Sequence, residues 1–119
     1  MEKQPSIDDQ FLKIINKIIQ DNLDNVYFTV KDLAQKVRLS RSMLHRKLKR
    51  LTSKSASEII AEKRVIKAKE MLENNVASAS EIAYKVGFSD PSYFNKVFKK
   101  HFDVSPGDVR KKGAPELDH

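Results

Sequence analysis

The sequence contains one pattern twice, and this repeat limits the fold more than any other feature. Leu33-Ala34, Lys36-Val37 and Leu39-Ser40 return 49 positions later as Ile82-Ala83, Lys85-Val86 and Phe88-Ser89. After one inserted residue the offset becomes 50, and Leu44, Arg46, Leu48, Lys49, Arg50 and Ser55 match Phe94, Lys96, Phe98, Lys99, Lys100 and Ser105. The chain is therefore expected to use the same structural unit twice.

Each copy has the apolar spacing of two short helices separated by a turn. This arrangement is a helix-turn-helix, whose second helix can enter a major groove of DNA. We predict the first helix-turn-helix over 29–52 and the second over 79–102. In the second copy, Ser89 or Asp90 is expected to cap the second helix, with Pro91 in its first turn, where a missing N–H costs little.

Three further helices are predicted around the two copies. An N-terminal helix over 7–23 carries a wide apolar stripe: Ile7, Phe11, Leu12, Ile14, Ile15, Ile18, Ile19 and Leu23. A linker helix over 55–74 opens with a Ser55 to Glu58 capping box and is expected to bury Ile59, Ile60, Ile66, Met71 and Leu72. A short C-terminal helix follows at about 106–112.

No strand pattern competes with these helices. We expect an all-α fold in which two helix-turn-helix subdomains are joined by a linker helix, with the extra N-terminal helix, as a single domain over 1–112. Residues 113–119 are expected to be a disordered tail, and whether it belongs to the natural protein or to an expression vector stays open. The N-terminal helix either caps the core of the first copy, which we favour, or mates with another chain.

Basic charge is concentrated in the repeated region. The formal net charge is +7, but residues 31–112 hold 20 basic and nine acidic residues. From Ser40 to Lys54 inclusive there are six basic residues and no acid, which indicates a surface for a polyanion more than an ordinary solvated face. The chain has no cysteine, no long apolar run and no secretory signal, so we expect a cytoplasmic protein without membrane contact.

Helical spacing sorts the second helix of each copy into two faces. Leu44, Leu48 and Leu51 are expected inside in the first copy, and Phe94, Val97 and Phe98 in the second, with Tyr93 at the border. The outward positions are Ser42, His45, Arg46 and Lys49, and 50 residues later Ser92, Asn95, Lys96 and Lys99. Stacking of Tyr93, Phe94 and Phe98 on single-stranded bases is the weaker alternative.

An enzyme is not expected, because catalytic and metal-ligand patterns are missing from the sequence. The three histidines are His45, His101 and His119, and none belongs to an HExxH motif or to an acid cluster with ligand spacing. The three glycines are isolated, so there is no glycine-rich phosphate loop. We therefore predict no cofactor and no metal.

Two segments carry a specific pattern: "SEIAYKVGFSDPSYFNKVFKKHFDVSPGDVRK", and the linker "RVIKAKEML" with Arg64, Ala68 and Leu72. On these motifs the chain, from Phe28 to Lys112, resembles the DNA-binding domain of AraC/XylS-type bacterial transcription regulators. The first half also resembles the output domain of hybrid two-component regulators. Departures are Arg38 where the second copy has Gly87, Ser53 and Asp103 where the family often has glycine, Ala56 for the first proline, and Val109 for a usual tyrosine. If the backbone at Arg38 is left-handed, the missing glycine costs about 1 kcal/mol.

The resemblance implies a reader of double-stranded DNA at a promoter. Two recognition helices about 34 Å apart would enter successive major grooves. We assign base contacts to Ser42, His45, Arg46, Ser92, Asn95 and Lys96, and backbone contacts to Arg41, Lys49, Arg50, Lys99 and Lys100. Further implied partners are RNA polymerase and a missing N-terminal sensor or receiver portion of the same chain.

Two other classes stay open at this point. A non-specific nucleic-acid-binding protein, including one for RNA, would also be basic, and a protein-docking module could use the N-terminal helix. The two outward sets differ, Ser/His/Arg/Lys against Ser/Asn/Lys/Lys, and this difference favours a reader of two unlike half-sites. The sequence does not encode the target site, the inducing signal or the choice between activation and repression.

Overall fold

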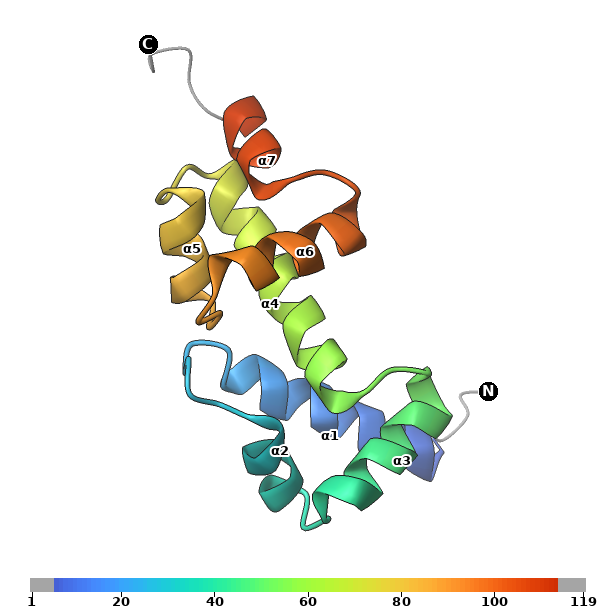
Figure 1. Ribbon diagram of the computed structural model, residues 1–119. Helices are drawn as coiled ribbons and strands as arrows, with labels where there is room; N and C mark the ends of the chain where they lie inside the picture. Colours follow the sequence, from blue (N-terminus) through green and yellow to red (C-terminus); the bar gives the residue numbers. More distant parts are fainter. Residues whose placement is uncertain (1–5, 114–119) are drawn as a thin grey trace, which may run out of the picture. The chain divides into compact units, whose positions relative to one another are not determined.

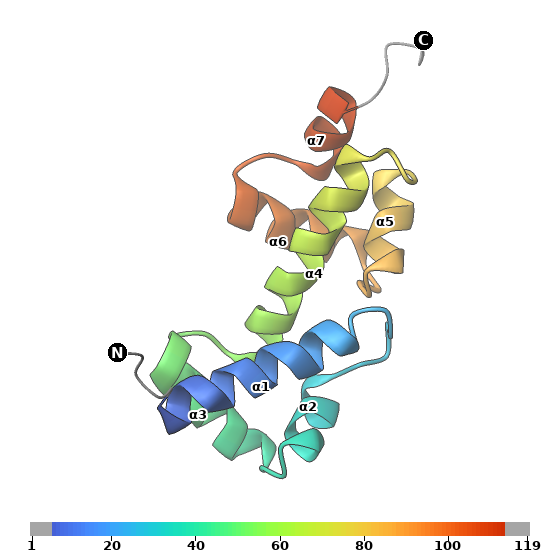
Figure 2. The same ribbon diagram turned by 180° about the vertical axis from the view of Figure 1, so that it is seen from behind.

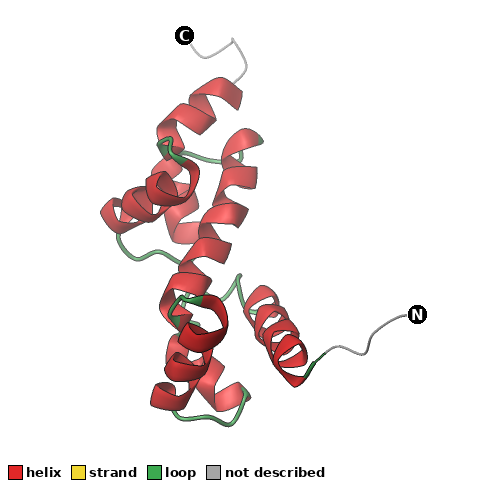
Figure 3. Cartoon of the chain, turned by 90° about the vertical axis from the view of Figure 1, so that its right-hand side faces the viewer, coloured by secondary structure: helices red, strands yellow, loops and turns green. Residues whose placement is uncertain are grey.

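The protein is described by a computed structural model that covers residues 6–113, with side-chain surroundings for 6–110. Every regular element in this part of the chain is a helix, which confirms the all-α prediction (Figure 3). The helices are α1 (Ile7–Asp21), α2 (Val30–Lys36), α3 (Arg41–Thr52), α4 (Ala56–Glu73), α5 (Ala79–Lys85), α6 (Pro91–Phe102) and α7 (Pro106–Gly113). The predicted tail lies outside the described residues except for Gly113, which ends α7.

The described chain forms two compact units, whereas the sequence favoured one domain. The first unit contains the residues up to Asn22 together with Phe28–Ile60, and the second contains Leu23–Tyr27 together with the residues from Ala61 onward. The first unit thus holds α1, α2, α3 and the start of α4 (Figure 1). The second holds the rest of α4 with α5, α6 and α7 (Figure 2).

The first unit is built on α1, α2 and α3. α1 packs against α2, and α2 against α3. Ile15 and Ile19 of α1 are 1% and 0% exposed, so this helix completes the core of its own unit. The other fully enclosed side chains of the unit are Leu33, Leu44 and Leu48. This packing answers the question that the sequence left open about the N-terminal helix, since α1 caps the first core.

Part of the predicted apolar stripe of α1 does not face that core. Ile7 and Ile14 belong to the predicted stripe but are 79% and 53% exposed. The stripe is wider than the arc that one neighbouring layer of helices can cover, and only the side carrying Ile15 and Ile19 is enclosed. α1 also ends at Asp21 and not at 23, because Asn22 caps it and the side-chain amide of Asn22 donates to the carbonyl of Ile18.

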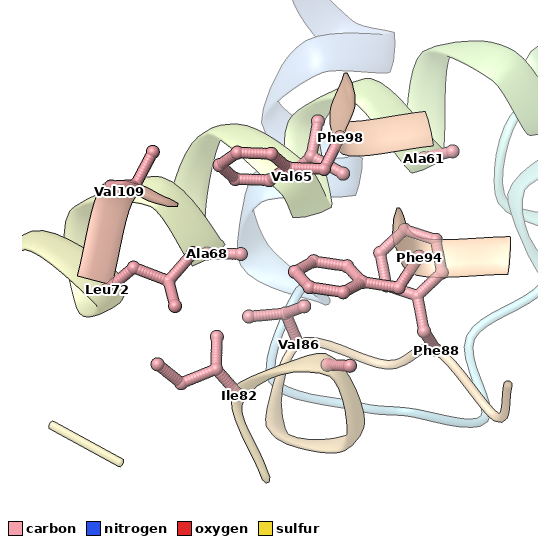
Figure 4. Close-up of a cluster of buried hydrophobic side chains, with 11 residues drawn as sticks. Ala61, Val65, Ala68, Leu72, Ile82, Val86, Phe88, Phe94, Phe98 and Val109 are labelled. Carbon is pink, nitrogen blue, oxygen red and sulfur yellow. The ribbon is translucent and has the colours of Figure 1, made fainter. Parts of the chain in front are cut away.

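The second unit encloses a cluster to which α4, α5, α6 and α7 all contribute (Figure 4). Phe94 and Phe98 of α6 lie at its centre, with ring centroids 5.7 Å apart. The face that α4 turns to them carries Ala61, Val65, Ala68 and Leu72 at helical spacing. Ile66 lies beside this face and is 51% exposed, so its predicted burial was also wrong.

The turn between the two helices of each helix-turn-helix has the same backbone form. In the first turn the amide of Arg38 donates to the carbonyl of Gln35, and that of Leu39 to the carbonyl of Ala34. In the second turn the amide of Gly87 donates to the carbonyl of Tyr84, and that of Phe88 to the carbonyl of Ala83. This pair of bonds ends a helix with one left-handed residue. Arg38 has φ 57° and Gly87 has φ 105°, so the first turn is left-handed without a glycine, which is the case for which the sequence implied a cost at Arg38.

Candidate nucleic-acid interface

α3 presents a polar face because its opposite side is fixed in the core of the first unit. The Ser40 hydroxyl accepts from the amide of Met43 at 3.1 Å and starts the helix. Leu44 and Leu48 are both 0% exposed, which sets the rotation of the helix about its axis. All four predicted outward side chains are exposed as a consequence: Ser42, His45, Arg46 and Lys49.

α6 presents its polar face in the same way. Asp90, not Ser89, caps the helix, and its carboxylate accepts from the amide of Ser92 at 2.9 Å. Pro91 is the first helical residue, as predicted. Phe94 and Phe98 are buried, and the outward set is again exposed: Ser92, Asn95, Lys96 and Lys99.

The five basic residues assigned to the DNA backbone have different surroundings. Arg41, Lys99 and Lys100 are exposed. The Lys49 ammonium lies 4.0 Å from a carboxylate oxygen of Glu58. A carboxylate oxygen of Asp8 lies 3.5 Å from the guanidinium of Arg50.

These two ion pairs are open to solvent, since their side chains are between 44% and 62% exposed. Exposed pairs of this kind are worth about 0–1 kcal/mol. The pairs therefore favour particular positions of the Lys49 and Arg50 side chains but hold neither side chain firmly.

An open groove of about 1000 Å³ runs beside α3 within the first unit. Its lining comprises Val30, Arg41, Ser42, His45, Arg46, Ser55, Ala56 and Ser57. One side is therefore formed by four residues already assigned to DNA, and another by the first residues of α4. The sequence reasoning did not assign Ser55 or Ser57 to the site.

The start of α4 is polar for a local reason that the sequence did signal. Ser55 and Glu58 form the predicted capping box: the amide of Glu58 donates to the Ser55 hydroxyl at 3.2 Å, and the amide of Ser55 to the Glu58 carboxylate at 3.1 Å. The Ser57 hydroxyl lies 3.2 Å from that of Ser55. Arg41 and Arg46 bring positive charge to the groove, and the Glu58 carboxylate at this helix start offsets part of it.

The part of the chain that the structure describes contains no group of three or more side chains that could hold a metal ion. Among the same residues, no helix is both long and apolar enough to cross a membrane.

Comparison with known proteins identifies the repeated region. Residues 33–112 match the family model of a helix-turn-helix domain. A protein of Formosa agariphila named Histidine kinase P4 is 39% identical over 112 residues, which are 94% of this chain and 8% of the kinase. The chain thus spans only a small part of that relative, and the kinase name belongs to the longer protein.

Two solved structures show the same fold. The C-terminal domain of the two-component response regulator yesN from Fusobacterium nucleatum is 31% identical, covers 85% of this chain and 98% of its own, and has a TM-score of 0.74. The DNA-binding domain of AdpA, a global transcriptional factor solved with a target DNA, is 25% identical with a TM-score of 0.70. That likeness covers 82% of this chain and 90% of the AdpA domain.

Proposed function

The chain belongs to the AraC/XylS family of helix-turn-helix DNA-binding domains, and we propose that it reads one asymmetric site on double-stranded DNA with α3 and α6. The observation that carries this proposal is the pair of exposed four-residue faces, each held outward by two buried residues of the same helix. The two faces lie at the same helical positions but differ in chemistry. Two unlike readers on one chain fit two unlike half-sites, in successive major grooves of the duplex.

The base contacts are assigned by hydrogen-bonding capacity. Arg46 can donate to O6 and N7 of one guanine together, and Asn95 can pair in a bidentate way with adenine. Ser42, His45, Ser92 and Lys96 complete the two sets. Because these side chains are exposed, they are accessible to bases without rearrangement of either core.

Phosphate contacts supply the affinity. Arg41, Lys99 and Lys100 are exposed, and Lys49 and Arg50 would exchange their carboxylate partners for phosphates on binding. The groove beside α3 suggests that the start of α4, at Ser55 and Ser57, also faces the DNA backbone.

The relatives support a proposal about the biological setting. A kinase and a response regulator both carry a domain like this one as a part of a longer chain. We therefore propose that a sensor or receiver portion lies on the N-terminal side of the natural protein. Its output would be transcription regulation, with RNA polymerase as a partner.

The decisive experiment is selection of bound duplexes from a random DNA library, followed by affinity measurements on the selected site. We expect two conserved blocks about 10 base pairs apart. Arg46→Ala should lose about 1–3 kcal/mol of discrimination in one block, and Lys96→Ala, at the matched position 50 residues later, should act on the other block.

Lys99→Ala serves as the backbone control. It should weaken binding to all sequences alike and reduce the slope of affinity against salt by about one unit. If no motif is selected and affinity follows salt alone, the surface binds polyanions without sequence preference and the proposal is wrong.

A further inference from the structure

Arg64 of α4 joins two backbone segments that are distant in the sequence. One nitrogen of its guanidinium donates to the carbonyl of Gly87 at 3.2 Å, and the other donates to the carbonyl of Asn25 at 3.4 Å. Gly87 belongs to the turn between α5 and α6, and Asn25 to the segment between α1 and α2. All three residues lie in the second unit.

Gly87 provides the space that the guanidinium occupies. A Cβ on residue 87 would lie 2.7 Å from Cζ of Arg64, well inside van der Waals contact. The backbone there also has φ 105°, a conformation that residues with a side chain rarely adopt. In the first unit the matched position is Arg38, whose φ is 57° and whose own side chain is exposed. The two turns thus share hydrogen bonds, but the first has an exposed arginine where the second has the glycine that Arg64 contacts.

The segment Leu23–Tyr27 is held against α4 by more than this contact. Lys67, one turn after Arg64, forms an ion pair with Asp24. Leu23 is buried, with 3% of its surface exposed. Asn25 therefore offers its carbonyl from a segment that is anchored by the burial of Leu23, and the exposed Lys67–Asp24 pair adds little to this.

The turn to which Arg64 donates its hydrogen bond leads directly into α6. Phe88 follows Gly87, is 6% exposed, and packs on Phe94 of α6 with ring centroids 5.2 Å apart. Asp90, which caps α6, is two residues further on. A shift of the carbonyl of Gly87 would therefore move Phe88 and the first turn of α6.

Burial lowers the pKa of Arg64 below its ordinary value, but an arginine remains charged at neutral pH and keeps its donors.

We propose that Arg64 is a positioning residue for α6, fixing through Gly87 the turn from which this helix presents Ser92, Asn95 and Lys96. The proposal rests on the function proposed above, because it assigns α6 to one block of the DNA site. It adds a residue that contacts no base but determines how strongly α6 discriminates between sequences at its block. It also predicts an asymmetry, since the turn of the first unit has an arginine in place of the glycine.

The first test needs no DNA. Amide hydrogen exchange of the full chain is compared for wild type, Arg64→Met and Lys63→Met, which removes the same charge from the preceding residue of α4. We expect Arg64→Met to exchange about tenfold faster at the amides of Gly87 and Phe88, since tenfold corresponds to about 1.4 kcal/mol and a hydrogen bond to a charged group is worth roughly that much. The matched amides of Arg38 and Leu39, and all four amides in Lys63→Met, should exchange as in wild type.

The second test uses the selected duplex with either block scrambled. Arg64→Met should reduce discrimination at the block read by α6 by about tenfold and at the other block by less than about twofold. Arg64→Lys keeps the charge but not the planar pair of donors, so it should fold and show a smaller defect at the same block. The salt dependence should stay that of wild type in all variants, because Arg64 is not assigned to a phosphate.

The two failures are distinguishable. Unchanged exchange at Gly87 and Phe88 in Arg64→Met, or equal acceleration in both turns, overturns the positioning role whatever the DNA result. Equal losses at both blocks overturn it as well, because they would mean a general loss of structure. A wild-type chain that selects no motif refutes the proposed function and the DNA half of this inference, while the exchange experiment still decides whether Arg64 fixes the turn.

Discussion

Ser53 and Asp103, fifty positions apart, end the two recognition helices in the same left-handed conformation, with φ 65° and 62°. The amide of Ser53 donates to the carbonyl of Lys49 at 2.9 Å, and that of Asp103 to the carbonyl of Lys99 at 2.8 Å. Left-handed backbone costs a residue with a Cβ about 1–2 kcal/mol, and aspartate tolerates it better than serine. The chain retains this geometry without glycine at either place.

Glycine at either position should therefore stabilise the protein. We expect Ser53→Gly to raise the free energy of unfolding by about 0.5–1 kcal/mol, and Asp103→Gly by somewhat less, because part of the relieved strain is offset by the extra entropy of glycine in the unfolded chain. Urea denaturation measures both. Lys13→Gly, at an exposed position inside α1, is the control and should lower the same free energy by about 0.7–1 kcal/mol. Destabilisation by all three changes would show that the left-handed residues carry no strain.

The first helix of each helix-turn-helix depends on a reciprocal cap. The Ser78 hydroxyl accepts from the amide of Glu81 at 3.2 Å, and Thr29 accepts from the amide of Asp32 at 3.3 Å. Ser78→Ala and Thr29→Ala should each lower the free energy of unfolding by about 1 kcal/mol, since each leaves helix-start amides without their acceptor. Ser80→Ala, an exposed serine inside α5, should change it by less than about 0.5 kcal/mol. Thermal unfolding followed by circular dichroism separates these values, and equal effects at Ser78 and Ser80 would contradict the capping role.

Phe98 is the enclosed centre of the second core. It is 0% exposed and lies between Phe94 and Phe102, with ring centroids 5.7 and 4.8 Å away. Phe98→Ala should reduce the free energy of unfolding by about 3–5 kcal/mol, through lost burial and the cavity left behind. Tyr93→Ala, on the same helix but 51% exposed, should have a much smaller effect in the same urea titration. Similar losses for the two variants would mean that the core is not organised around Phe98.

Local signals in the sequence were enough to predict the helices and the direction of both recognition faces. Caps and period fix a helix boundary within a few residues, and the pairs Leu44/Leu48 and Phe94/Phe98 are spaced by one turn, so the opposite face follows. Both parts of this reasoning use residues less than five positions apart. They required no knowledge of how the helices pack.

Errors arose where packing between helices decides the outcome. Ile66 was expected inside and follows the buried Val65, but it is 51% exposed. Ile7 and Ile14, on the predicted stripe of α1, are also left exposed by the neighbouring helices. Periodicity shows that a helix has an apolar side; it does not show which half of a wide side a partner will cover.

Contacts between distant residues could not be predicted from the sequence either, because they too depend on how the helices pack. Arg64 meets residues 39 positions before it and 23 positions after it. Ser57 joins the groove beside α3 only because α4 begins there. Neither fact has a local signature, although the glycine at position 87 did mark the turn as special.

The last prediction concerns the ion pair between Asp8 of α1 and Arg50 of α3, which lie 3.5 Å apart. If Arg50 binds a phosphate, Asp8 competes for the same guanidinium in the free protein. Asp8→Asn should therefore tighten binding to the selected duplex by about two- to fivefold at low salt, and the gain should shrink as salt screens the charges. Stability should change by no more than about 1 kcal/mol, because the pair is exposed and a carboxylate at a helix start contributes little more.

Asp21→Asn is the matched control for this change. It removes the same charge from the other end of α1, where Asp21 pairs with Lys17 at 3.0 Å and not with a residue of a recognition helix. We expect its effect on DNA affinity to be clearly smaller than that of Asp8→Asn at every salt concentration. Equal gains would indicate a general effect of net charge, and no gain from Asp8→Asn would remove Arg50 from the backbone contacts. An Arg50→Ala background separates these readings, since a gain that acts through Arg50 disappears there while a general charge effect persists.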